Sequence, residues 1–154
     1  MHALLKKLNH KEQAIYCLNA PPSFLNALAQ SGATVYDHIK TAKEIEFVLA
    51  FVTAQKEIDN LVPELVPKLN GDAVLWMCYP KGSSKKFKCD FNRDTGWAVL
   101  GAYNLEGVRM VAIDEDWSAL RFRNVAYIKT MTRSKLNALS AEGKLKTANP
   151  KGKT

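Results

Sequence analysis

The chain has 154 residues, of which 47% are hydrophobic and 24% charged, the proportions of an ordinary globular domain. This length predicts one domain that can bury enough apolar surface to fold without a metal or a disulfide. No apolar run approaches the roughly 18 residues that span a bilayer, and the N-terminus lacks the apolar core of a secretory signal. We therefore expect a cytoplasmic protein without a membrane partner.

The formal net charge of +7 is concentrated in two segments. Residues 129–154 carry seven Lys or Arg against Glu142 alone, a net of +6, and residues 80–93 carry five against Asp90 alone, a net of +4. A basic tail and a basic loop allow contact with nucleic acid. The rest of the chain has no such excess, so nucleic acid is not favoured as the main partner.

The three cysteines, Cys17, Cys78 and Cys89, match neither the spacing of a zinc site nor a Cys-x-x-Cys redox pair. Cys17 and Cys78 lie in apolar runs, where cysteine behaves as a small hydrophobic residue. We expect reduced, structural thiols and no metal site.

The first half of the chain alternates predicted strands with predicted helices. Pro22 suits the first turn of a helix because its missing N–H needs no partner there, and Gly32 suits the end of that helix. Thr53 is expected to cap a second helix, in which Pro63 and Pro67 predict a kink or break near residue 62. Apolar runs predict strands over residues 13–18, 33–39 and 45–52, and Asn70-Gly71-Asp72 is expected to end the second helix.

The second half begins with a predicted strand over residues 73–79, apolar on both faces. A basic loop over residues 80–88 follows, and then a helix is expected over about residues 92–103, with Asp90 or Asn92 as its cap. The short connection between predicted strands 108–113 and 119–123 indicates an antiparallel hairpin. Residues 126–141 are expected to form a surface helix and residues 143–154 an unstructured tail.

Strand–helix–strand alternation with strands buried on both faces predicts an α/β fold. We expect a Rossmann-like three-layer α/β/α arrangement, in which a mostly parallel sheet is closed by an antiparallel edge hairpin. Methyltransferase-type sheets end in the same way, an analogy of fold alone. The domain is assigned to residues 1–128, and a basic C-terminal helix and tail to residues 129–154.

In open α/β sheets, ligands bind beyond the carboxyl ends of the strands, near the point where the strand order reverses. The residues just past the predicted strands are polar or conformationally special, so this rim is the expected site. The candidate ligand-binding residues are Asn19, Pro21, Asp37, Pro80, Lys81, Ser83, Ser84, Asp114, Asp116, Trp117 and Arg121. The spacings identify no serine–histidine–acid set, so the catalytic residues are unassigned.

The basic loop combines Gly82, two serines and four lysines, which suits contact with a phosphate. It does not match a Walker loop, and the alternative is a solvated, flexible loop. The turn Asp114-Glu-Asp-Trp117 carries three carboxylates that can act as acid and base or as a metal shell. We favour the alternative of a tight hairpin turn, with Trp117 packed and Arg121 paired to Asp114 or Asp116.

Asp37 ends the second predicted strand, where an acidic residue often binds ribose hydroxyls in dinucleotide and S-adenosylmethionine folds. The loop after the first strand is Asn19-Ala-Pro-Pro, without the glycine that lets a pyrophosphate or a methionyl group approach the backbone. This absence argues against a nicotinamide dinucleotide and weakens the case for S-adenosylmethionine. The cofactor is therefore unassigned.

Three blocks stand in the order Leu18-Asn-Ala-Pro-x-x-Phe24, Leu75-Trp-x-x-Tyr-Pro-Lys81 and Asp114-x-x-Trp-Ser-x-x-Arg-Phe122. As a set, they resemble a family of short, uncharacterised bacterial proteins with a Rossmann-like fold, a domain of unknown function. The resemblance covers roughly residues 13–123 and implies the fold, but no reaction or cofactor. It also implies that the matching positions belong to one feature: Asn19, Pro21, Pro80, Lys81, Asp114, Trp117, Ser118 and Arg121. The longer basic loop and the basic tail depart from the family's shorter members.

These features favour a small Rossmann-like protein that binds an anionic or phosphorylated small molecule at the carboxyl rim of its sheet. One alternative is a degenerate S-adenosylmethionine-dependent, methyltransferase-like enzyme that uses Asp37 and the Asp114–Trp117 turn. Another is a nucleic-acid-associated protein that contacts phosphates through its basic loop and tail. The sequence assigns neither an enzymatic activity nor an oligomeric state.

Overall fold

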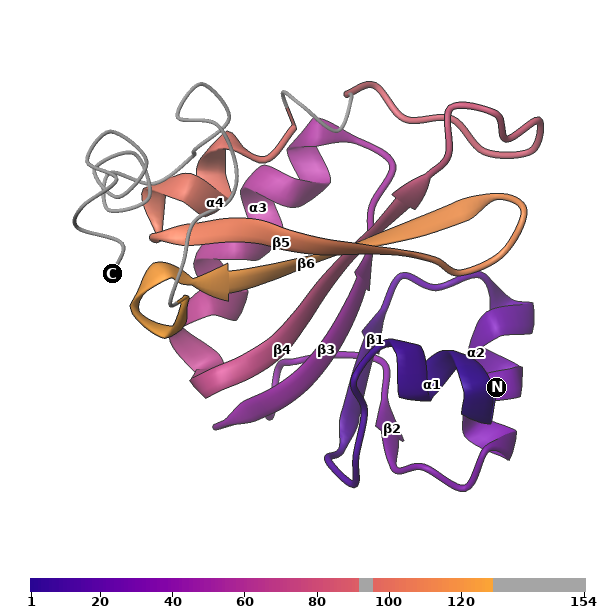
Figure 1. The fold of residues 1–154 in the computed structure, drawn as a ribbon, viewed down its shortest axis with the longest axis horizontal. Helices are drawn as coiled ribbons and strands as arrows, with labels where there is room; N and C mark the ends of the chain where they lie inside the picture. Colours follow the sequence, from indigo (N-terminus) through magenta and orange to yellow (C-terminus); the bar gives the residue numbers. More distant parts are fainter. Residues whose placement is uncertain (92–95, 129–154) are drawn as a thin grey trace.

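The computed structural model describes residues 1–91 and 96–128. A six-stranded sheet in the order β2-β1-β3-β4-β6-β5 forms its centre (Figure 1). The helix and tail expected after residue 128 lie outside the described residues, so they stay predictions.

The first strand–helix–strand unit is β1 (Ile15–Leu18), α2 (Pro22–Gln30) and β2 (Val35–Tyr36). Pro22 opens α2, and Gly32 follows its last turn with a φ of 89°, the left-handed conformation that suits glycine. Both features agree with the sequence prediction, whereas β2 has only two residues and is shorter than predicted.

A short helix that the sequence analysis does not predict, α1 (His2–Lys7), precedes this unit. The indole Nε1 of Trp76, a fully buried residue of the sheet, donates a hydrogen bond of 2.8 Å to the carbonyl of Leu8, just after α1. Leu5 and Leu8 are also buried. This tertiary anchoring explains how so short a helix is held in place.

The second unit consists of β3 (Ile45–Phe51), α3 (Gln55–Leu65), the 3-10 turn η1 (Val66–Lys68) and β4 (Leu69–Pro80). The sequence predicts a kink or break near residue 62, and a break is wrong, since α3 passes through Pro63 to Leu65. Ile58, Val62 and Leu65 on its apolar face are fully buried, and this packing outweighs the hydrogen bond that Pro63 cannot make.

The beginning of β4 also differs from the prediction that Asn70-Gly71-Asp72 ends a helix. These residues belong to β4, and Gly71 has a φ of 57°. The pairing of β3 with β4 shifts register at this level, between Ile45 and Phe47. The turn-forming residues therefore produce an irregularity within the strand.

In the last part of the domain, α4 (Ala98–Ala102) is shorter than the helix predicted over residues 92–103, part of which lies outside the described residues. It is followed by β5 (Leu105–Ala112), β6 (Trp117–Asn124) and the 3-10 turn η2 (Val125–Tyr127). β5 and β6 pair antiparallel, as predicted.

The sheet is mostly parallel, because β6 alone among its six strands runs against the others. β6 lies between β4 and β5, so β5 is the edge strand. The prediction of a sheet closed by an edge hairpin needs correction on this point, since the sheet is open and the hairpin extends it. The strand order reverses between β1 and β3, because β2 lies on one side of β1 and β3 on the other.

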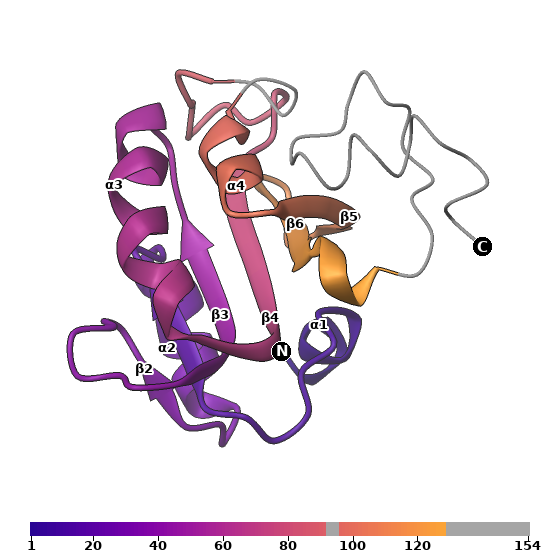
Figure 2. The ribbon, with the colours of Figure 1, turned by 90° about the vertical axis from the view of Figure 1, so that its left-hand side faces the viewer.

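Two hydrophobic clusters fill the space between the sheet and its helices. One contains buried residues of α3 and α4, and the other contains buried residues of α1 and α2. Figure 2 shows α3 and α1 on opposite sides of β3 and β4. The three-layer α/β/α arrangement is thus confirmed. Among the described residues, no helix combines the length and apolar character needed to cross a bilayer.

Candidate functional site

The carboxyl end of β4 meets the start of β6 at one edge of the sheet. Pro80 pairs with Trp117, and the backbone N–H of Lys81 donates a hydrogen bond of 2.8 Å to the carbonyl of Asp116. The structure therefore brings these four of the predicted site residues together. Their meeting follows from the antiparallel pairing of β6 with β4.

The basic loop is anchored to the β5–β6 turn. The hydroxyl of Ser84 donates a hydrogen bond of 2.8 Å to Asp116 Oδ1 and accepts one of 3.1 Å from the backbone N–H of Phe87. Ser84 is 7% exposed, whereas Ser83 is exposed. Ser84 thus holds the loop in place, and its hydroxyl is already engaged within the protein.

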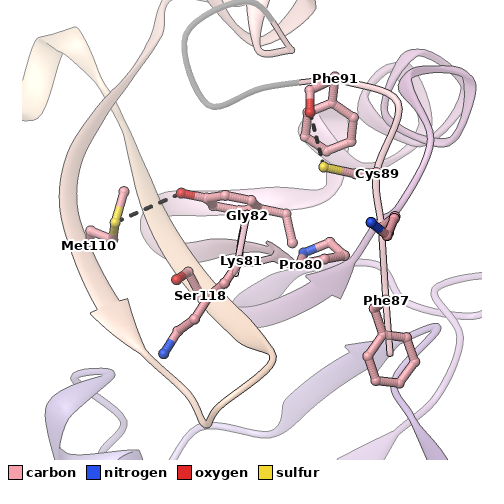
Figure 3. A pocket seen from close by; sticks show the side chains of 10 residues that line it. Pro80, Lys81, Gly82, Phe87, Cys89, Phe91, Met110 and Ser118 are labelled. Atoms are coloured by element: carbon pink, nitrogen blue, oxygen red, sulfur yellow. Dashed lines mark hydrogen bonds between the residues drawn. The ribbon is translucent and has the colours of Figure 1, made fainter. Parts of the chain in front are cut away.

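A cavity of about 520 Å³, which we call the Lys81 cavity, lies on this rim (Figure 3). Two lysines, Lys81 and Lys88, line it, and no carboxylate does so among the described residues. Neither lysine forms an ion pair with a described residue. The remaining lining residues are Tyr79, Pro80, Gly82, Phe87, Cys89, Phe91, Met110 and Ser118.

A second cavity of about 320 Å³, which we call the Asp114 cavity, lies beside the start of α2, and four of the predicted rim residues line it: Pro21, Asp114, Asp116 and Trp117. Its carboxylates are Asp114 and Asp116, so its charge differs from that of the Lys81 cavity. Phe87 lines both cavities. The other residues around the Asp114 cavity are Pro21, Ser23, Phe24, Phe51, Lys86 and Trp117.

The turn that carries Asp114 is a tight hairpin turn, which is the alternative that the sequence analysis favoured. Asp114 Oδ1 accepts hydrogen bonds of 2.8 Å and 2.9 Å from the backbone N–H groups of Asp116 and Trp117. Trp117 is 4% exposed and packs edge-on against Phe51. Within the described residues, no group of three or more His, Cys, Asp or Glu side chains is arranged to hold a metal ion.

Arg121 does not lie at the rim. It pairs with Trp76 on β4 and Arg109 on β5, four residues along β6 from Trp117. It forms no ion pair with a described carboxylate, in contrast to the predicted pairing with Asp114 or Asp116, and its Nε is buried without a hydrogen-bond partner. Burial is the main cause that lowers the pKa of this guanidinium.

Asp37 is exposed, directly after β2, and also lies apart from the two cavities. Three strands separate β2 from β6 in the sheet, which places Asp37 about 19 Å from the Asp114–Trp117 turn at roughly 4.8 Å per strand. The structure therefore does not unite the two features that the methyltransferase-like alternative requires.

Asn19 follows β1 with a φ of 58°, in the left-handed region. The loop lacks the glycine of dinucleotide-binding folds, and an asparagine adopts the positive φ in this position instead. Asparagine is one of the few other residues that enter this region readily. Asn19 is exposed and lines neither cavity.

Near the point where the strand order reverses, the chain occupies the N-terminus of α3 with its own carboxylates. Glu57 Oε1 accepts hydrogen bonds from the backbone N–H groups of Thr53 and Ala54, at 2.8 Å and 3.0 Å. Asp90 Oδ1 accepts one of 2.7 Å from the N–H of Gln55. An anionic ligand would have to displace Asp90 to bind there, so the Lys81 cavity is the freer position for an anion.

Sequence reasoning missed the side chains that shape the Lys81 cavity, namely Phe87, Cys89 and Phe91. The signal available was the presence of two aromatic residues within an otherwise basic and polar segment. Cys89 Sγ lies 2.9 Å from the carbonyl oxygen of Phe91, and the thiol is half-buried.

The other two thiols are structural. Burial, followed by the charge of Asp37, raises the pKa of Cys17 from 9.0 to about 12. Burial, followed by the influence of Cys17, also raises the pKa of Cys78 well above 9.0. Both side chains are therefore neutral and unreactive near neutral pH.

Among solved structures, the chain is similar to the crystal structure of a protein in the NADB-Rossmann superfamily from Streptococcus agalactiae, with 13% sequence identity and a TM-score of 0.42. The similarity covers 78% of this chain and 55% of that one, so the chain spans about half the length of that protein. No protein-family model and no curated protein matches the sequence. The resemblance to a family of short bacterial proteins therefore stays a prediction, while the Rossmann-like fold rests on the strand order and the layers described above.

Proposed function

We propose that this protein binds an anionic, phosphate-bearing small molecule in the Lys81 cavity. The observation that carries the proposal is the charge of the walls: two lysines line the cavity, and no described carboxylate does. The Asp114 cavity on the same rim has the opposite character, which makes it the poorer place for an anion.

The surroundings of the lysines strengthen their attraction for an anion. Most of the wall is apolar, and a partly enclosed apolar wall weakens the screening of charges by water. Lys81 is half-buried and Lys88 exposed, and neither is neutralised by a described partner. Gly82 leaves open space beside the loop backbone, since a Cβ atom there would meet nothing within 4 Å.

The two alternative functions have less support. A methyltransferase-like reaction through Asp37 and the Asp114–Trp117 turn would require groups on strands that are not neighbours to act together. Nucleic-acid binding through the basic loop and tail would use the same loop lysines, but the tail, residues 129–154, lies outside the described residues. The charge of the Lys81 cavity supports a small anion without involving Asp37 or the tail.

The test is a thermal-shift titration with inorganic phosphate, pyrophosphate and ribose phosphate. A ligand at about one hundred times its Kd stabilises the native state by about 2.7 kcal/mol, which corresponds to a rise in Tm of about 5–10 °C for a domain of this size. We expect Lys81→Ala and Lys88→Ala each to weaken binding about tenfold, the loss of one hydrogen bond to a charged group. Lys85→Ala is the matched control, because Lys85 is an exposed lysine of the same loop that does not line the cavity.

Cys89 offers a second measurement, because its half-buried thiol lines the same cavity. A bound ligand should slow the reaction of this thiol with a disulfide reagent. The proposal fails if none of the three probes stabilises the protein or protects Cys89. It also fails if Lys85→Ala weakens binding as much as Lys81→Ala does.

A further inference from the structure

Aromatic rings in the Lys81 cavity stay partly exposed. Phe87 and Phe91 are half-buried, and both line the cavity from the segment that follows β4. Figure 3 shows them apart from Met110 and Ser118, which line the cavity from β5 and β6. Met110 is itself 43% exposed. The cavity therefore presents apolar surface to solvent beside its lysines.

Both phenylalanine rings are fixed by buried aromatic neighbours. The ring centroid of Phe91 lies 5.2 Å from that of Trp97, and the centroid of Phe87 lies 5.0 Å from that of Trp117. The two tryptophans are 2% and 4% exposed, so they form a rigid support. A ligand that covers rings already held in place loses little free energy to ordering them.

We infer that the ligand of the Lys81 cavity is a phosphate ester that carries a planar aromatic or heteroaromatic ring, the chemical class that includes nucleotides. This inference rests on the proposed anion site: the lysines hold the phosphate, and Phe87 and Phe91 contact the ring. The volume of about 520 Å³ accommodates both parts, since small-molecule sites span roughly 300–1,000 Å³. Every nucleobase has a π-face that stacks on aromatic side chains.

Smaller or less planar anions use only part of this cavity. An inorganic phosphate would contact the lysines and leave the aromatic wall exposed to water. A sugar phosphate would bring hydroxyl groups against Phe87 and Phe91, and these rings offer no hydrogen-bond partner in return. A planar ring instead removes apolar surface from water on both partners.

The test compares adenosine monophosphate with ribose phosphate, a pair that differs only by the base. We expect the wild-type protein to bind adenosine monophosphate at least about fivefold more tightly, the lower end of the effect of stacking one base. Phe87→Leu and Phe91→Leu should each bring the ratio of the two affinities closer to one. Tyr36→Leu is the control, because Tyr36 is 44% exposed and lies on β2, remote from the cavity.

The two phenylalanine variants guard against an effect on folding, since each ring packs on a different tryptophan. The midpoint of thermal unfolding is measured for both variants. The change in ligand preference is judged from the variant whose midpoint is closer to that of the wild type. Equal binding of the two ligands, with Lys81→Ala weakening both, would overturn the ring inference and leave the anion site intact. Binding of neither ligand would overturn the anion site itself. A preference for adenosine monophosphate that persists in both phenylalanine variants would also refute the inference.

Discussion

Replacing Ser84 by alanine removes the side-chain hydrogen bond that ties the basic loop to the β5–β6 turn. The change deletes the 2.8 Å hydrogen bond to Asp116 and leaves the N–H of Phe87 without its acceptor. Hydrogen bonds to charged groups contribute about 1.5–3 kcal/mol. Asp116 is half-exposed, so water can replace the lost hydroxyl, and we expect a cost near the lower end, about 1.5 kcal/mol.

Urea unfolding measures this cost directly. With a slope of about 1–3 kcal/mol per molar urea, the midpoint of Ser84→Ala should fall by about 0.5–1.5 M. Ligand affinity should fall as well, because Phe87 and both cavity lysines belong to the released loop. Ser83→Ala is the matched control, since Ser83 is exposed and its change should alter the free energy of unfolding by less than about 0.5 kcal/mol. Equal unfolding midpoints for the two variants would refute the anchoring role.

Three further expectations concern the loop, the buried thiols and the tail. Gly82→Ala should raise the free energy of unfolding by about 0.4–1 kcal/mol, because the added methyl group meets open space and restricts the unfolded chain. The same methyl group should weaken ligand binding in a titration if the ligand contacts the loop backbone. The Cys17 thiol stays neutral in the folded protein up to a pKa of about 12 but ionises above 9.0 in the unfolded chain. Cys17 should therefore lower stability by about 1.4 kcal/mol per pH unit between these values. Chemical unfolding should find this contribution missing in Cys17→Ala, while the contribution of Cys78, whose pKa is also raised, remains. Deleting residues 144–154 removes four lysines, which should weaken any binding to RNA in a salt titration and leave phosphate binding unchanged, whereas tight RNA binding by the shortened chain would contradict our preference for a small ligand.

The sheet is the part of the fold that the sequence predicts best. β3 and β4 are apolar on both faces, and such runs are typical of strands covered by helices on each side. α1 could not be found in the same way, because six residues hardly form a helix in isolation and the contact with Trp76 lies far along the chain. Pro63 predicts a kink or break, yet α3 continues for two residues beyond it, because buried side chains hold the face of the helix.

The position of the candidate site on the carboxyl rim was predictable from the sequence, but the division of that rim into two cavities was not. Topology alone placed Pro80 and Lys81 at the carboxyl edge of the sheet. The hairpin turn between β5 and β6 brings Asp116 and Trp117 to the same edge. That the rim forms two cavities of different charge depends on the anchoring of the loop by Ser84, which no spacing reveals. Arg121 could have been excluded: each residue of a strand advances about 3.3 Å, so it lies roughly 13 Å from Trp117.

Three carboxylates near the rim have structural partners, whereas its lysines form no ion pair with a described residue. Asp114 accepts hydrogen bonds within its turn, Asp116 holds Ser84, and Asp90 caps α3. The lysines of the loop are left without described ion-pair partners, so an anion would relieve their mutual repulsion on binding. This charge contribution is screened by salt over a Debye length of about 10 Å at 0.1 M, whereas contact with Phe87 and Phe91 is not. The dependence of affinity on salt therefore separates the two contributions: a steep fall indicates binding by the lysines, and a shallow one indicates binding by the aromatic wall.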